Sequence, residues 1–167
     1  MNLKSLLVLV FTIFATSNLV ADEGDADISF YTGTFDVIDK EGDDQTSLFG
    51  IEHKNPNLFR DTFLGKFQPV TGAFMTGDSS VYFYTGVEAN YSVGILNITP
   101  SFTPGLYRQG SGKDLGHPLE FKSEVQLSLD LSEGTNFGMS YNHVSNASLG
   151  DKNPGANSYM FNFLKRF

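Results

Sequence analysis

Hydrophobic and polar residues alternate one by one along much of this chain. The alternation is clearest between Leu119 and Leu131. The apolar positions there are Leu119, Phe121, Val125, Leu127, Leu129 and Leu131, and the polar positions between them are Glu120, Lys122, Glu124, Gln126, Ser128 and Asp130. Because successive side chains of a β-strand point to opposite faces, this pattern predicts a strand with one apolar and one charged face.

Seven other segments read as strands, and no segment keeps helical periodicity for three turns. The eight predicted strands cover about residues 28–38, 46–54, 62–76, 80–91, 94–107, 119–131, 135–147 and 157–167. The turns expected at 90–93 and 132–136 are short, whereas 40–45 and 108–118 are polar loops. An even number of strands allows both termini to lie on one side of a membrane.

The alternation alone fits two architectures. In a soluble sandwich or a lipocalin-like barrel, the apolar face would form the core and the charges would lie in water. In a small outer-membrane barrel, the apolar face contacts lipid and the charged side chains pair inside the lumen. After residue 21 no apolar run reaches the about 20 residues of a membrane helix, but a barrel strand needs only about 10.

The two ends of the chain favour the membrane barrel. Residues 1–21 combine the basic Lys4, an apolar stretch and the small Ala21, as in a cleaved secretory signal peptide, which leaves 22–167 as one barrel domain. The last predicted strand carries Tyr159, Phe161, Phe163 and Phe167. This ending resembles the C-terminal signature that the barrel assembly machinery reads. We therefore expect an all-β, eight-stranded antiparallel transmembrane β-barrel in the bacterial outer membrane.

Composition narrows the range of functions. Loss of Lys4 takes the formal net charge from -8 to -9, and no basic cluster is present, so nucleic-acid binding is not expected. Cysteine is absent, so the exported domain must hold together without disulfides. The sequence contains no GxSxG, P-loop or HExxH motif, and it implies no metal and no organic cofactor.

His143 and Ser145 are the strongest candidates for chemistry. They lie two residues apart on a predicted strand, so their side chains share one face at roughly 6–7 Å. An imidazole can span that gap and take the proton of a serine hydroxyl, which makes the hydroxyl a nucleophile. Their face also carries Phe137, Met139 and Tyr141, so in a membrane barrel the pair would look toward lipid.

The sequence around this pair resembles the lipid A 3-O-deacylase (PagL-type) family of outer-membrane hydrolases. The similar stretches are His143-Val144-Ser145-Asn146-Ala147, Asn153-Pro154-Gly155, Pro100 to Tyr107, Asp114-Leu115-Gly116 and Leu119-Glu120-Phe121. The resemblance implies a serine esterase that acts on lipid A, with Ser145 as nucleophile and His143 as base. It also implies an active site at the outer leaflet, where lipid A resides.

The third member of the site departs from the family pattern. The family has a glutamate where the eighth strand opens, and the matching residue here is Asn157. An amide oxygen can accept the imidazole N–H but cannot stabilise imidazolium by charge, so we expect a slower triad. Asp151 is an alternative carboxylate. Asn146, Asn153 and the backbone N–H groups of the intervening loop are candidates for binding the oxyanion.

The leading hypothesis is release of the 3-O-linked acyl chain of lipid A. Two membrane alternatives remain open from the residues: a phospholipase or lipase using the same pair, and a non-catalytic structural or adhesion barrel with a degenerate site. A soluble lipocalin-like binder is the fourth. His53 and His117 lack comparable partners and are expected to be non-catalytic.

Overall fold

The computed structural model describes residues 27–38, 45–55, 58–63 and 65–166. The expected signal peptide, 1–21, and Phe167 lie outside the described residues. The strands are β1 (Asp27–Phe35), β2 (Thr46–Lys54), β3 (Arg60–Thr62), β4 (Gly65–Thr76), β5 (Val81–Ala89), β6 (Tyr91–Val93), β7 (Leu96–Arg108), β8 (Leu119–Ser132), β9 (Thr135–Ser145) and β10 (Ala156–Arg166). None of the described residues forms a helix long and apolar enough to cross a membrane.

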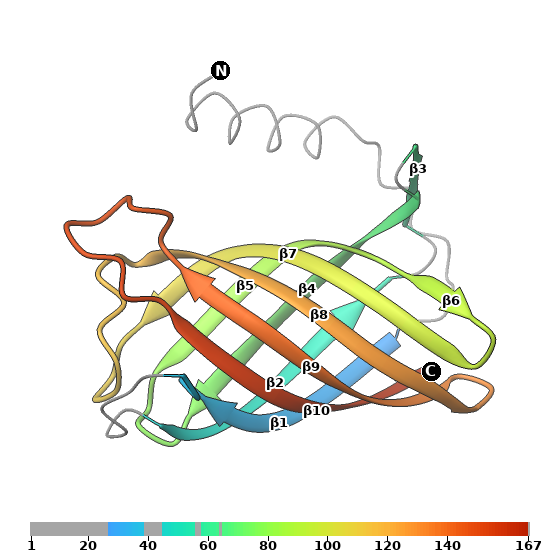
Figure 1. Ribbon diagram of the computed structural model, residues 1–167, viewed down its shortest axis with the longest axis horizontal. Helices are drawn as coiled ribbons and strands as arrows, with labels where there is room; N and C mark the ends of the chain where they lie inside the picture. The colour runs from blue at the N-terminus through green and yellow to red at the C-terminus, as the bar shows by residue number, and fades with distance from the viewer. Residues whose placement is uncertain (1–26, 39–44, 56–57, 64, 167) are drawn as a thin grey trace.

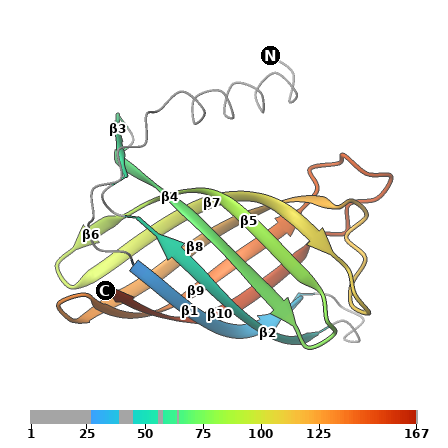
Figure 2. The ribbon, with the colours of Figure 1, turned by 180° about the vertical axis from the view of Figure 1, so that it is seen from behind.

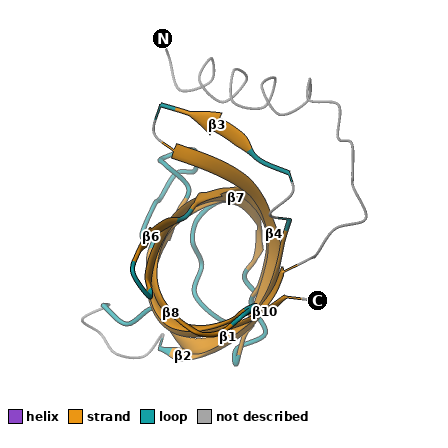
Figure 3. Ribbon diagram, turned by 90° about the vertical axis from the view of Figure 1, so that its right-hand side faces the viewer, coloured by secondary structure: helices purple, strands orange, loops and turns teal. Residues whose placement is uncertain are grey.

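Eight of these strands form a closed antiparallel barrel, which confirms the predicted fold class. Each pairs with its neighbours in the order β2-β1-β10-β9-β8-β7-β5-β4, and pairing of β2 with β4 closes the ring. Figures 1 and 2 show the strands tilted around a common axis from opposite sides, and Figure 3 shows the ring from one end. Closure leaves no unpaired sheet edge in the wall, as a membrane requires.

The barrel has two different ends. We call one the loop end; there β1 ends and β2 begins, and there lie the connections 77–80, 109–118 and 146–155. The other, the terminal end, holds the start of β1, the end of β10, the short strand β3 and the connections 94–95 and 133–134. Gly94 and Gly134 make the tight turns there with φ of 65° and 70°, a conformation that glycine adopts at low cost.

Two predicted boundaries were wrong. The turn expected at 90–93 lies at 94–95, because Asn90 interrupts the strand and the chain then re-pairs with β7 as β6. The third strand, expected from residue 62, starts at Gly65, and β3 folds back on its beginning. This extra hairpin accounts for the length of the connection that follows β2.

Apolar side chains cover the outside of the wall. Large hydrophobic residues that are more than two-fifths exposed include Phe30, Phe49, Ile51, Met75, Phe83, Val125, Leu127, Leu129, Phe137, Met139, Tyr159, Phe161 and Phe163. In a soluble protein such a surface would be an aggregation hazard. On a closed sheet it matches the lipid-facing band of an outer-membrane barrel, about 25 Å tall.

Charged residues fill part of the lumen, as the alternation predicts. Lys122 is fully buried, with Nζ 3.2 Å from Glu52 Oε1 and 2.9 Å from Glu124 Oε2. Lys54 Nζ lies 2.7 Å from Glu88 Oε2. Tyr31 and Tyr84 pack beside this network and share a 2.7 Å hydrogen bond. Pairing offsets much of the cost of removing these charges from water. Because these paired side chains are buried, this part of the lumen is packed rather than open.

Candidate active site

The β9–β10 pair places His143 beside Asn157. The two residues are register partners at the loop end of the barrel. Nδ1 of His143 lies 3.0 Å from Oδ1 of Asn157, so a proton on Nδ1 can be donated to the amide oxygen. That arrangement leaves Nε2 without its proton and able to accept one from another group.

Tyr141 holds the same amide from the other side. Its hydroxyl donates to Oδ1 of Asn157 at 2.7 Å. An oxygen that accepts from both Tyr141 and His143 fixes which way the Asn157 amide faces. From the sequence, Tyr141 was expected only as an apolar member of this face. The sequence shows that Tyr141 and His143 share a face. The partner of the Tyr141 hydroxyl, however, depends on the exact register between β9 and β10, which alternation does not determine.

Gly155 makes room for the imidazole. An ideal Cβ at Gly155 would lie 2.8 Å from Cε1 and 3.4 Å from Nε2 of His143. The same glycine has a φ of 65°, which L side chains rarely adopt. Since Ala156 is the partner of Val144, Gly155 lies at the level of Ser145. The Cε1–Nε2 edge of the His143 ring therefore faces the level of the barrel at which Ser145 lies.

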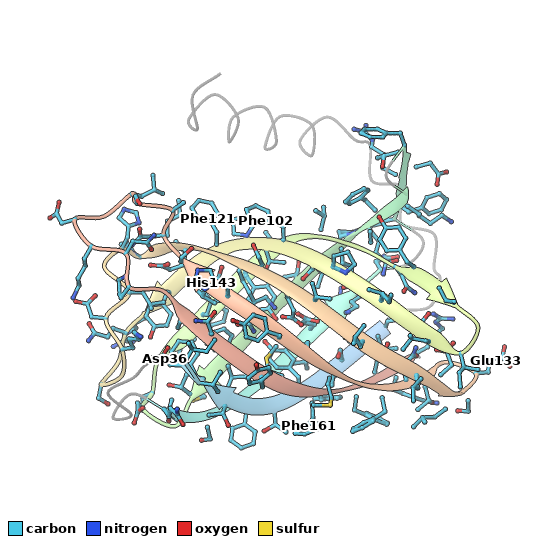
Figure 4. The ribbon with its side chains drawn as sticks, viewed as in Figure 1. Asp36, Phe102, Phe121, Glu133, His143 and Phe161 are labelled. Atoms are coloured by element: carbon cyan, nitrogen blue, oxygen red, sulfur yellow. The ribbon has the colours of Figure 1, made fainter. Side chains whose placement is uncertain are left out.

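Ser145 is the last residue of β9 and is half-buried. It is the register partner of Phe121 on β8, and the Phe121 ring stacks on Phe102 at 6.0 Å. Phe102 is exposed whereas Phe121 is buried, and Figure 4 shows both toward the loop end. Within the described part of the chain, no hydrogen bond joins the Ser145 hydroxyl to His143. Hydrogen bonds of this kind are often long in free enzymes and shorten when substrate binds.

The structure separates the Asn146 side chain from this pair. Asn146 is fully buried, and its Nδ2 donates to the carbonyls of Leu115 and Lys152, both at 2.8 Å. Its backbone N–H donates to Oδ1 of Asn153 at 3.0 Å. Asn146 and Asn153 thus tie the 146–155 loop to itself and to the 109–118 loop. Both hydrogens of the Asn146 amide are already engaged on the inner side of the strand.

The chain turns sharply after Asn146. Ala147 and Ser148 have φ values of 53° and 62°, and the N–H of Leu149 donates to the carbonyl of Asn146 at 3.1 Å. Left-handed backbone costs a non-glycine residue about 1–2 kcal/mol. The N–H groups of Ala147 and Ser148 have no hydrogen-bond partner among the described residues. Strained backbone clusters at functional sites, and these two residues follow Ser145 closely in the chain.

An ion pair at the surface joins the two loops. Asp114 Oδ2 lies 2.7 Å from Nζ of Lys152, and Asp114 Oδ1 accepts the N–H of Gly116 at 2.9 Å. The hydrogen bond from Lys152, and then that from Gly116, hold the pKa of the Asp114 carboxyl below its ordinary value. The pair links the 109–118 loop to the 146–155 loop that follows Ser145.

The other candidate residues lie apart from the pair. Glu120 and Glu124 are buried in the lumen, as their parity predicts. Asp151 is exposed in the 146–155 loop, and the structure gives it no bond to His143 among the described residues. His117 accepts the N–H of Leu119 at Nδ1, 3.0 Å away. No cluster of three or more His, Asp or Glu residues in the described ranges could hold a metal ion.

Comparison with known structures supports the barrel. The chain is similar to the crystal structure of the outer membrane enzyme PagL, with a TM-score of 0.62 and 18% identity over 83% of this chain and 98% of that one. It is also similar to Neisserial surface protein A (TM-score 0.52, 9% identity, 87% and 100% covered) and to Ail of Yersinia pestis (TM-score 0.51, 13% identity, 87% and 100% covered). At these identities the likeness concerns the fold.

The family follows from the sequence match. No curated protein matches the chain. The family model for lipid A 3-O-deacylase (PagL) matches residues 44–166. That range includes seven of the barrel's eight strands and every candidate site residue described above. The chain belongs to the lipid A 3-O-deacylase (PagL) family of outer-membrane β-barrel proteins.

Proposed function

We propose that this protein is an outer-membrane carboxylic ester hydrolase that removes the 3-O-linked acyl chain of lipid A, with Ser145 as nucleophile. The observation that carries the proposal is the 3.0 Å contact between His143 Nδ1 and Asn157 Oδ1, two residues from Ser145 on the lipid-facing side. Such a contact selects the imidazole tautomer whose Nε2 can accept a proton. Family membership supplies the substrate class.

The chemistry is a two-step acyl transfer. Ser145 Oγ attacks the ester carbonyl while His143 Nε2 accepts the hydroxyl proton. The tetrahedral intermediate collapses, the bond to the sugar oxygen breaks, and His143 returns the proton to that oxygen. Water then attacks the acyl-serine, again with His143 as base. The free fatty acid and the sugar with a free 3-hydroxyl are the products, and Ser145 is regenerated.

Asn157 is the positioning residue in this scheme. Its amide oxygen holds the Nδ1–H of His143 but carries no charge to stabilise the imidazolium that forms in each step. The second hydrogen bond, from Tyr141, keeps the amide in the accepting orientation. A neutral orienting group supports catalysis at a lower rate than a carboxylate in the same place.

The oxyanion donors are the backbone N–H groups of Ala147 and Ser148, together with Nδ2 of Asn153. Asn146 supports them rather than binding the oxyanion through its side chain, because both hydrogens of its amide already bind backbone carbonyls. Fixed donors of this kind typically contribute about 3–4 kcal/mol each to stabilising the transition state of acyl transfer.

The substrate reaches the site from the lipid phase. Ser145 and His143 lie at the loop end of the outer wall, between the stacked rings of Phe102 and Phe121 and the tilted pair Tyr141 and Tyr159. Long loops of outer-membrane barrels face the outside of the cell. With that orientation the site lies at the outer leaflet, and an acyl chain would lie against the exposed apolar wall.

Purified protein in detergent micelles tests the proposal. Wild type and Ser145→Ala are each given lipid A and, separately, a diacyl phospholipid, and the products are identified by mass spectrometry. Release of a 3-hydroxy fatty acid from lipid A by the wild type alone supports deacylation. Cleavage of the phospholipid but not of lipid A would make the protein a phospholipase. Wild type inactive on both substrates would favour a non-catalytic barrel.

A further inference from the structure

A short hairpin leaves the barrel wall at its terminal end. β3 pairs only with the start of β4, with Arg60 opposite Phe67 and Asp61 opposite Lys66. In Figure 1 this hairpin stands away from the wall, and the end-on view of Figure 3 shows β3 outside the ring rather than over its mouth. A segment displaced to the side at one end of a membrane barrel lies along the membrane surface.

The hairpin is aromatic and basic. Phe63 is 96% exposed and Phe59 is 48% exposed. Nζ of Lys66 lies 3.6 Å from the centre of the Phe59 ring, and the Arg60 side chain is exposed. Exposed aromatic rings interleaved with lysine or arginine are the side chains that barrels place where the apolar band meets the headgroups. Lysine and arginine there bury their stems and reach lipid phosphates with their charged ends.

We propose that this hairpin is a lateral foot that rests on the phospholipid headgroups at the terminal end of the barrel. Phe59 and Phe63 enter the boundary between headgroups and acyl chains, and Arg60 and Lys66 meet the phosphates. This inference requires the barrel to span the outer membrane but does not depend on Ser145 chemistry. With the orientation proposed above, the foot contacts the inner leaflet.

Two observations, one of apolar surface and one of charge, favour lipid over a protein partner. The apolar surface begins at Tyr91, which lies at the base of the hairpin, since a Cβ at Gly65 would lie 3.2 Å from Cε1 of its ring. Beside it Val93 and Ile95 are about two-thirds exposed, so apolar surface of the wall continues to the hairpin. The hairpin carries two basic residues, Arg60 and Lys66, and one acidic residue, Asp61, whereas the whole chain has a net charge of -8. A local positive charge on an acidic protein is complementary to anionic lipid.

The chain contains no tryptophan, so a single introduced one reports its own surroundings. The Phe63→Trp variant is reconstituted into vesicles of phosphatidylcholine with or without phosphatidylglycerol, with acyl chains brominated close to the headgroup. The Glu133→Trp variant is the matched control, because Glu133 is exposed at the tip of the same end of the barrel. Heat-modifiable gel mobility confirms that each variant is folded.

Tryptophan emission from the Phe63→Trp variant is expected to be shifted to the blue of that from the control. The bromines should quench the emission of Phe63→Trp and leave that of Glu133→Trp unchanged. Quenching in Phe63→Trp should increase with phosphatidylglycerol, and the added substitutions Arg60→Glu and Lys66→Glu should remove that increase.

Three results would count against the foot. Water-like, unquenched emission from the Phe63→Trp variant would overturn the proposal. A blue shift without quenching would mean that a protein surface covers this position, and would also overturn it. Quenching that does not change when phosphatidylglycerol is added would overturn the proposed contact of Arg60 and Lys66 with anionic lipid.

Discussion

Gly155 lies so close to the His143 imidazole that a Cβ at Gly155 would be 2.8 Å from Cε1. The ring would have to move, and small displacements of a catalytic group can cost about 100-fold in rate. We expect Gly155→Ala to lower deacylase activity by about 10- to 100-fold while the barrel still folds. The measurement is the rate of fatty acid release by purified protein.

Gly94→Ala is the control for this substitution. Gly94 also has a φ of 65°, but no atom lies within 4 Å of the position that its Cβ would take. Both variants carry a similar backbone penalty of about 1–2 kcal/mol, and only Gly155→Ala displaces the imidazole. Equal activity in the two variants would show that Gly155 has no part in positioning His143.

A carboxylate in place of the Asn157 amide should raise the rate of the reaction. Asn157→Glu replaces a neutral acceptor by a carboxylate that can also stabilise imidazolium, and hydrogen bonds to ionised groups are about twice as strong as neutral ones. We expect this variant to release fatty acid faster than wild type and Asn157→Leu to release it more slowly. A rate that falls in Asn157→Glu would show that the amide itself is required.

Tyr141→Phe tests the second contact to the same amide. The substitution keeps the ring and removes the 2.7 Å hydrogen bond to Oδ1 of Asn157. A neutral hydrogen bond contributes about 0.5–1.5 kcal/mol, so a loss of about two- to tenfold in rate is expected. Tyr159→Phe is a suitable control, because Tyr159 shares the tilted ring contact but makes no described hydrogen bond to Asn157. Equal rates in the two variants would remove Tyr141 from the site.

Alternation predicted the strands and which of their side chains share a face, and the two ends of the chain then favoured the membrane barrel. In β8 the buried residues Glu120, Lys122 and Glu124 share the luminal face, and the ion-pair partners of Lys122 lie in the lumen as expected. The pattern fails where neither face of a strand is buried. Arg60-Asp61-Thr62 is exposed throughout, so β3 has no alternation by which to be recognised.

The placement of the candidate site residues was predictable as far as strand parity determines it. The strand parity of His143, Ser145 and Asn157 follows from the sequence, and β9–β10 has the matching register. The contacts of Tyr141 and Gly155 were not predictable, because they require the spacing between two strands and the rotamer of His143. Asn146 was expected near the oxyanion, but it reaches the carbonyls of Leu115 and Lys152 on loops whose course no pattern encodes.

The luminal charges should dominate the stability of the barrel. Lys122→Met leaves Glu52 and Glu124 without their shared cation in a buried site, and breaking a buried pair costs about 3–5 kcal/mol. Lys152→Met removes a lysine whose side chain is 57% exposed, and little loss of stability is expected from an ion pair in water. The stabilities of the two variants are compared by the midpoint of urea unfolding, with gel mobility as the probe of the folded state. Equal midpoints would contradict a structural role for the luminal network.

The surface ion pair of Asp114 and Lys152 should respond to acid. Because the pKa of Asp114 is lowered in the folded state, its contribution to stability is present above the ordinary carboxyl value of about 3.9 and is lost as the pH falls through the lower folded value. The amide resonance of Gly116, which donates to Asp114, should shift with a midpoint below about 3.9 in a solution NMR titration. A midpoint above that value would mean that Lys152 does not hold the carboxylate.

The most direct test of the proposed reaction is the lipid A of living cells. Gram-negative cells whose lipid A carries a 3-O-acyl chain are made to express wild type or Ser145→Ala at equal levels in the outer membrane. Mass spectrometry of extracted lipid A should show loss of one 3-hydroxyacyl chain with wild type and an unchanged pattern with Ser145→Ala. Lipid A that keeps the chain in both strains, or loses it in both, would contradict ester cleavage by Ser145.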